Sequence, residues 1–294
     1  MKPVTLAAVL AMAFAYSASA DVSPLVIEAE ASIKQVRYDV AIVLLNRDIA
    51  ANPNDSRAYC DRAYAYFGER DINHALADCH TAISLDGNNS SAYSVLGSIN
   101  WVTGHNDDAR ADFDEALTLA PTNVTFWYNR GFFYLHKDNT KAVQDFTQAL
   151  RMNPGYADAW YNRGNAFLDE HQYDSAISDF SAGIPLNPKY GNLYHERAFA
   201  YQCEGKLNNA IADYTSAIAL KPQSGTEYYS RGTAYGEAHD YQHAVQDYTA
   251  AIQLDPRNPG FYYQRGLCYQ QLGDQVHADA DSKEAAMLKS QPGN

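Results

Sequence analysis

The chain has 294 residues, of which 46% are hydrophobic, and a formal net charge of −13 from 22 basic and 35 acidic side chains. This acidity argues against a nucleic-acid-binding protein, because contact with phosphates depends on clustered lysine and arginine. The sequence also has no glycine-rich phosphate loop, no nucleophile motif and no cluster of carboxylates suited to catalysis, so we expect neither an enzyme nor a bound cofactor.

The first twenty residues differ from the rest. Lys2 precedes an apolar run from Val4 to Tyr16, which is followed by the small residues Ala18, Ser19 and Ala20. This order is typical of a secretory signal, and residues 1–20 are predicted to be removed. A permanent anchor is the alternative, but a run of thirteen residues is too short to cross a bilayer easily. We expect export across the inner membrane to a bacterial periplasm, with a eukaryotic secretory route as the alternative, and no membrane span after cleavage.

A block of thirty-four residues recurs along the remaining chain. One small residue marks each clear copy: Ala63, Gly97, Gly131, Gly164, Ala198, Gly232 and Gly266. A second small residue follows twelve positions later, or eleven in the third clear copy, which predicts that one residue is missing from a turn there. An acidic residue that usually precedes an aromatic one comes next, and the copy closes on a proline, which Gly87 replaces once. Apolar and small residues recur at three and four spacing before the proline, which predicts two helices of about a dozen residues per copy.

The plainest copy contains Ala159, Trp160, Gly164, Ala176 and Phe180 and closes on a proline. Its period, small residues, aromatic positions and closing proline resemble the tetratricopeptide repeat (TPR) family over about nine-tenths of the chain. The resemblance implies an all-α, right-handed superhelical solenoid of about eight antiparallel helix-turn-helix units. Such a solenoid offers a long open surface for binding.

The repeat register predicts one domain over residues 22–292 with no room for a second. The predicted units are a degenerate copy at 22–55, then repeats 1 to 7 at 56–89, 90–123, 124–156, 157–190, 191–224, 225–258 and 259–292. The last helix is more polar than the others, so repeat 7 is expected to cap the stack. A position within a repeat is called its place, counted from the first residue of that repeat.

An arginine at place 7 precedes an aspartate at place 23 in most repeats. The midpoint of this interval falls in the interhelix turn, so the two side chains face each other across the hairpin. We therefore predict a structural ladder of ion pairs, with an anion-binding strip as the weaker alternative. The pairs are Arg62 and Asp78, Arg130 and Asp145, Arg163 and Asp179, Arg197 and Asp213, Arg231 and Asp247, and Arg265 and Asp281. Repeat 2 has Leu96 instead of the arginine but keeps Asp112.

In the TPR family the first helix of each hairpin lines a concave groove through places 2, 5, 6, 9, 12 and 13. Carried onto this sequence, these places give a partner-binding set rich in aromatic and amide side chains: Trp101, Tyr128, Asn129, Phe132, Tyr161, Asn162, Asn165, Tyr229 and Tyr263. Tyrosine offers large contact area at low entropic cost, and asparagine can hydrogen-bond a peptide backbone. The alternative is that the tyrosines at place 5 only pack between helices. At Trp101, either an apolar pocket or a locally shifted helix fits the sequence.

Charges at the groove places are mostly acidic, and the lysines and arginines with which some family members grip a C-terminal carboxylate are absent. We therefore expect a nonenzymatic scaffold that binds an extended, neutral or basic peptide or protein. The alternatives are binding of a cell-envelope glycan and a role as accessory subunit of an envelope enzyme complex.

Two further residue types need an interpretation. Cys60 and Cys79 lie on the two helices of one hairpin, so a disulfide between them is conceivable, with free thiols as the alternative. His239 and His243 are four residues apart but straddle a turn. Helical metal-ligand geometry is therefore doubtful, and no metal site is expected.

Overall fold

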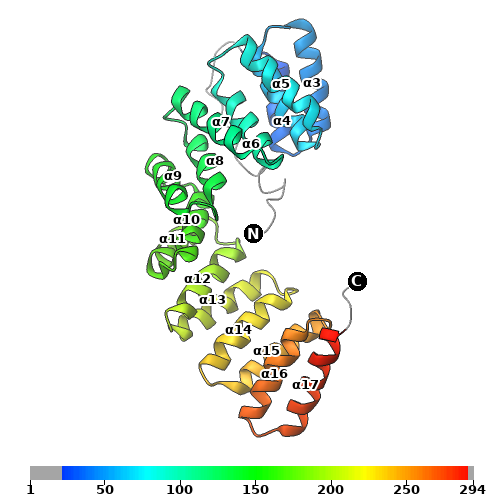
Figure 1. The fold of residues 1–294 in the computed structure, drawn as a ribbon, viewed down its shortest axis with the longest axis vertical. Coiled ribbons are helices and arrows are strands. Elements are labelled where there is room, and N and C mark those ends of the chain that lie inside the picture. The colour runs from blue at the N-terminus through cyan, green and yellow to red at the C-terminus, as the bar shows by residue number, and fades with distance from the viewer. Residues whose placement is uncertain (1–21, 291–294) are drawn as a thin grey trace. The chain divides into compact units, whose positions relative to one another are not determined.

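The structure of the protein is a computed structural model that describes residues 22–290. Over this range the chain forms sixteen α-helices and no strand. Contacts divide it into an N-terminal unit, Met1–Pro154, and a C-terminal unit, Gly155–Asn294. Within each unit, consecutive helices form antiparallel hairpins that lie side by side (Figure 1). The predicted all-α fold of helical hairpins is confirmed.

Each unit contains four hairpins among the described residues. The helices of the N-terminal unit are α2 (Pro24–Lys34), α3 (Tyr38–Ala51), α4 (Ser56–Gly68), α5 (Ile72–Leu85), α6 (Ser90–Val102), α7 (Asn106–Leu119), α8 (Val124–Tyr134) and α9 (Asn139–Met152). Those of the C-terminal unit are α10 (Ala157–Asp169), α11 (Tyr173–Leu186), α12 (Gly191–Cys203), α13 (Leu207–Leu220), α14 (Gly225–Glu237), α15 (Tyr241–Leu254), α16 (Pro259–Gln271) and α17 (Gln275–Ser290).

Small residues allow the two helices of a hairpin to approach closely. A methyl group on Gly164 of α10 would lie 2.6 Å from the Phe180 ring of α11, which is shorter than any van der Waals contact allows. Phe180 is fully buried and packs with Ala176, Leu193 and Ala200. The repeating small residue and the repeating aromatic are therefore two halves of one contact, and this contact fixes the spacing of each hairpin.

The interhelix turns share one backbone feature. One residue in each has positive φ: Val36, Arg70, Gly104, His136, His171, Gly205, His239 and Gly273. In the turn after α4, the Asp71 amide donates to the Tyr66 carbonyl at 2.8 Å, and the Arg70 amide donates to the Phe67 carbonyl at 3.1 Å. This is the Schellman arrangement that ends a helix on a left-handed residue. Glycine adopts that conformation without steric cost, and histidine is among the better-tolerated alternatives.

The structure adds detail to three predictions. Helix α8 has 11 residues whereas α6 and α10 have 13, so repeat 3 is shorter because its first helix ends early, not because a turn residue is missing. Helix α17 covers the end of the stack but still exposes Val276 and Met287. The predicted signal, residues 1–20, lies outside the described residues. Each predicted repeat contains one hairpin, although its boundaries stay predictions.

No helix within residues 22–290 is long and apolar enough to span a membrane.

Candidate functional site

The arginines at place 7 form bidentate ion pairs with the aspartates at place 23, or at place 22 in the shorter repeat 3. In all six pairs the Nε–Oδ2 distance is 2.7 or 2.8 Å and the Nη2–Oδ1 distance is 2.8 or 2.9 Å. The hydrogen bonds that Arg231 donates to Asp247 raise the pKa of Arg231, although desolvation opposes them. Because the carboxylates are buried and satisfied, the ladder has a structural role and leaves no strip of unpaired arginines for an anion.

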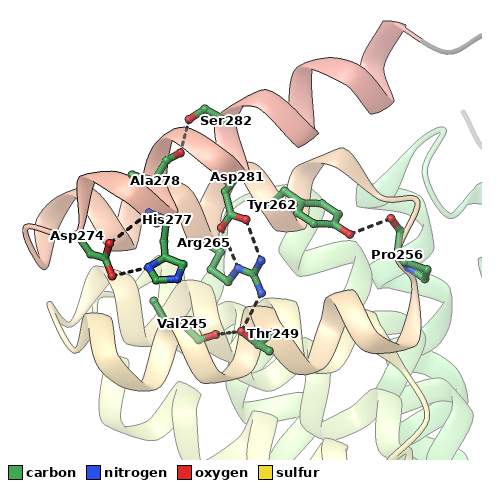
Figure 2. Close-up of polar contacts among 10 residues, drawn as sticks. All are labelled: Val245, Thr249, Pro256, Tyr262, Arg265, Asp274, His277, Ala278, Asp281 and Ser282. Atoms are coloured by element: carbon green, nitrogen blue, oxygen red, sulfur yellow. Dashed lines mark hydrogen bonds and ion pairs between the residues drawn. The ribbon is translucent and has the colours of Figure 1, made fainter.

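Five of these arginines also reach the preceding repeat. In Figure 2, Arg265 pairs with Asp281 while its third nitrogen, Nη1, donates to the Thr249 hydroxyl at 3.0 Å. The equivalent Nη1 acceptors, all at place 25, are Asn46, Asp114, Ser181 and Thr215. Tyr262 and Tyr269 flank the Arg265 guanidinium at 5.7 and 5.9 Å from their ring centroids. The guanidinium therefore joins two repeats as well as two helices.

Repeat 2 replaces this pair with an amide. Asn100 Nδ2 donates to Asp112 Oδ2 at 2.8 Å, and Leu96 occupies the place of the arginine. Desolvation raises the pKa of Asp112 to about 6, because the Asn100 hydrogen bond and the charge of His80 oppose it only in part. Helix α6 runs without interruption from Ser90 to Val102 and has the same 13-residue length as α10.

Replacing Leu96 with arginine is expected to stabilise the N-terminal unit at pH 7 by about 1 kcal/mol, because Asp112 gains a cation. Since its folded pKa is raised, Asp112 contributes stability at low pH that is lost as the pH rises through about 6. The full shift corresponds to roughly 3 kcal/mol, but Asp112 is only half-buried, so solvent screening reduces the effect. Urea unfolding between pH 4 and 7 measures this slope. Leu96→Arg should flatten it, as should Asp112→Asn, and an unchanged slope in both variants would contradict the assignment.

Three histidines belong to helix caps. Asp71 precedes α5 and accepts from the His74 backbone at 3.2 Å and from its Nδ1 at 2.6 Å, and these bonds lower the pKa of Asp71. The His74 ring stacks on Tyr66 at 5.0 Å. His243 and His277 make the same contacts in repeats 6 and 7. These rings are therefore parts of a recurring N-cap.

The described residues offer no ready metal site. His239 is in a turn with its Nδ1 bonded to the Tyr241 hydroxyl at 2.8 Å, so it does not converge with His243. Within residues 22–290 there is no group of three or more His, Cys, Asp or Glu side chains that could hold an ion. All four cysteines are free, so Cys60 and Cys79 are not bridged.

The predicted groove residues of the N-terminal unit are mostly packed against protein. Trp101 is buried with its ring edge-on to Phe132 at 5.7 Å, and Lys137 Nζ lies 5.2 Å from the Trp101 ring centroid. Tyr128 is buried against Phe132 at 6.1 Å, and Asn129 is buried and donates to Ser94 Oγ at 3.1 Å. Trp101 is therefore enclosed by protein side chains, and of this group only Phe132 is half-exposed.

The predicted residues of the C-terminal unit are more accessible. Asn162 is buried, whereas Tyr161, Asn165 and Tyr229 are half-buried and Tyr263 is 49% exposed. Tyr161 packs edge-on against Tyr190 at 5.2 Å, and Tyr229 packs against Phe261 at 5.2 Å. The tyrosines at place 5 thus pack between helices and still present part of each ring to solvent.

Sequence reasoning missed two exposed apolar residues. Phe199 and Leu267, both at place 9, are 44% and 38% exposed. We define the first-helix face of the C-terminal unit by seven residues at groove places: Phe199, Leu267, Tyr161, Tyr229, Tyr263, Glu196 and Glu237. Gln202 of α12 donates to Glu237 of α14 at 2.8 Å, which shows that neighbouring first helices meet along this face. These two residues could have been predicted from the sequence, because place 9 is one of the groove places.

A hollow of about 440 Å³ lies on another part of this unit, beside α10 and α11. It is lined by Arg163, Phe167, Asp174, Ser175, Ser178 and Asp179. Arg163 and Asp179 of this lining pair with each other at 2.7 Å, and Asp174 pairs with Lys206 at 3.1 Å, so each charged group of the lining already has an ionic partner.

Comparison with known proteins agrees with this geometry. Family models described as TPR repeat or tetratricopeptide repeat match residues 60–124, 157–190, 191–224 and 239–273, which together exceed half of the chain. The chain is 33% identical over 90 residues to mouse RNA polymerase II-associated protein 3, a match that covers 31% of this chain but 14% of the mouse protein.

Two solved structures show the same fold. The C-terminal part of a TPR repeat-containing protein from Cytophaga hutchinsonii has a TM-score of 0.64 at 22% identity, covering 81% of this chain and 98% of that one. YrrB, described as a TPR protein with an unusual peptide-binding site, has a TM-score of 0.51 at 22% identity, covering 60% and 92%. The repeated hairpins and the matching family models lead to one assignment: the chain belongs to the tetratricopeptide repeat family.

Proposed function

We propose that this protein is a nonenzymatic scaffold that binds an extended, neutral or basic segment of a partner protein on the first-helix face of its C-terminal unit. One observation carries the proposal. Phe199, Tyr263 and Leu267 are exposed at groove places of α12 and α16, and Glu196 and Glu237 occupy groove places of α12 and α14. Large apolar side chains on an otherwise solvated surface are typical of binding sites.

The chemistry of this face favours a particular kind of partner. Half-buried tyrosines and exposed Phe199 give contact area with few rotatable bonds, and Asn165 has an amide that suits a peptide backbone. No lysine or arginine occupies a groove place in repeats 4 to 7. A basic segment is therefore attracted and an acidic one repelled. YrrB, with its described peptide-binding site, supports a peptide ligand by analogy.

Selection of peptides from a random phage-displayed library on the intact chain tests the proposal, with calorimetry on the peptides obtained. Phe199→Ala is expected to weaken binding roughly 30-fold, the effect of truncating a desolvated aromatic anchor. Val276→Ala is the matched control, since Val276 is 78% exposed but lies on α17, outside this face.

The sequences selected also test the charge preference. We expect lysine or arginine to be enriched, and a double reversal of Glu196 and Glu237 to lysine to weaken these peptides. Equal losses in the Phe199 and Val276 variants, enrichment of acidic peptides, or binding to a carbohydrate array alone would each overturn the proposal.

We also propose that the protein works outside the cytosol, after removal of residues 1–20. The support is the signal-like order of charge, apolar run and small residues. Sequencing of the mature N-terminus tests this, and a chain that retains Met1 would contradict it.

A further inference from the structure

One buried charge interrupts the packing between repeats. Place 3 is filled by a buried apolar residue in six repeats: Ala58, Ala92, Phe126, Ala159, Leu193 and Phe261. At the junction of repeats 5 and 6 it is filled by Glu227, of which only 4% is exposed. A buried carboxylate is costly unless it is paired, so this exception needs a partner.

That partner is the histidine at place 5 of the preceding repeat. His195 Nδ1 on α12 lies 2.6 Å from Glu227 Oε2 on α14, and the two side chains are 22% and 6% exposed. The His195 ring also meets Tyr214 of α13 edge-on at 5.4 Å. Lys221, between α13 and α14, is 3.9 Å from Glu227 Oε1 and donates to Asn192 at the start of α12. One titratable side chain therefore lies at the centre of the contact between two neighbouring first helices.

We infer that the junction of α12 and α14 is a pH-sensitive joint, in which protonated His195 holds the two helices together through Glu227 and deprotonation loosens them. The inference goes beyond the proposed function, because it concerns this chain alone and does not depend on which partner binds.

The surrounding charges determine the direction of the effect. Desolvation lowers the pKa of His195, but the hydrogen bond and charge of Glu227, with a further contribution from Glu196, raise it above its ordinary value despite the opposing charge of Lys221. Tyr214 of α13 contacts the His195 ring edge-on and adds no charge there. Among the described residues, the ion pair of His195 is with Glu227 of α14 and not with a residue of α10 or α11. Because the folded pKa is raised, the stabilisation is complete at low pH and is lost as the pH rises through the folded value. The joint should therefore be tight at a pH below the folded pKa of His195 and looser at a pH above it.

The chain provides its own control. At the junction of repeats 4 and 5, Tyr161 at place 5 faces Leu193 at place 3, and both fit the same hairpin geometry. The double substitution His195→Tyr and Glu227→Leu copies this pair, so it removes the charges with a combination that this fold already accommodates. Glu227→Gln removes only the charge and leaves an acceptor for Nδ1–H.

Hydrogen–deuterium exchange of the intact chain, corrected for intrinsic exchange rates, tests the joint at pH 6 and at a pH above the midpoint that NMR titration gives for His195. Amides of residues 191–237 should exchange several-fold faster at the higher pH in the wild type, whereas those of 157–190 should not change. The double variant should show no such difference. An NMR titration of the His195 ring should give a midpoint above 6.5, and Glu227→Gln should lower it.

Two results would overturn the inference. One is equal protection of residues 191–237 at both pH values in the wild type. The other is a His195 midpoint that Glu227→Gln leaves unchanged. Circular dichroism of each variant at pH 6 checks that its helices are intact, and the double variant keeps the test informative if Glu227→Gln fails to fold.

Discussion

Replacing Phe180 with alanine is expected to lower the free energy of unfolding of the C-terminal unit by about 3–5 kcal/mol. The side chain is fully buried between α10 and α11 and contacts the neighbouring repeat through Leu193. Removing the ring leaves a cavity where the two helices of the hairpin approach closely. The backbone near Gly164 does not move enough to fill this cavity, so the lost contacts are not replaced. Urea unfolding followed by circular dichroism measures the change.

A double-mutant cycle with Gly164 makes this test specific. Gly164→Ala alone should cost about 1–3 kcal/mol by overpacking against the Phe180 ring. In the Phe180→Ala background the added methyl group has room, so its cost should largely disappear. Strict additivity of the two substitutions, or a loss below about 1 kcal/mol for Phe180→Ala, would show that the two residues do not form one contact.

Replacing Asp247 with alanine is expected to destabilise the C-terminal unit by about 3 kcal/mol, because the guanidinium of Arg231 then stays partly buried without a carboxylate. Arg231 donates to Asp247 at 2.8 Å through both Nε and Nη2, and the aspartate side chain is 7% exposed. Thermal or urea unfolding at pH 7 measures the loss. Asp279→Ala is the matched control, since Asp279 is an exposed aspartate on α17.

Removing both partners should be less harmful than removing one. The double variant Arg231→Leu and Asp247→Leu is expected to recover most of the stability, because an apolar pair replaces a buried ion pair at little net cost. If the double variant is as unstable as Asp247→Ala, the loss comes from changed packing and the ion pair is not the cause.

The fold could be predicted from sequence because each repeated letter corresponds to a local contact. Gly164 and Phe180 meet within one hairpin, and so do Arg163 and Asp179. Because both partners of such a contact belong to one repeat, the same residue types recur at the same places along the chain. Aligning the repeats by their period is therefore enough to identify these contacts.

The candidate site was harder to predict, because burial at a groove place depends on the neighbouring repeat. Tyr128 and Tyr161 both occupy place 5, yet Tyr128 is buried and Tyr161 is half-exposed. The register identifies the place but not how the residues around it fill the space. Phe199 is the opposite case to Tyr128, because it is a large apolar residue at a groove place that its neighbours leave exposed.

Two other features, the acceptors at place 25 and the buried Glu227, could not be predicted because the residue type at these places varies between repeats. The acceptors at place 25 are asparagine, aspartate, serine or threonine, which share only an oxygen, so no repeated residue marks the contact with arginine. Glu227 occurs once, and a single exception at place 3 has no pattern to reveal it. Its role follows only from the 2.6 Å contact with His195.

The arginine at place 7 also determines where this chain can be cut and rejoined. Its aspartate belongs to the same repeat, but its third acceptor, such as Thr249 for Arg265, belongs to the repeat before. A chimera assembled from whole thirty-four-residue blocks would therefore keep each ion pair and separate each arginine from its natural place 25. Exchange between related chains is best tolerated when the crossover falls in the turn between the first and second helices of a repeat. The second helix, with its acceptor at place 25, then comes from the same parent chain as the next first helix, with its arginine at place 7.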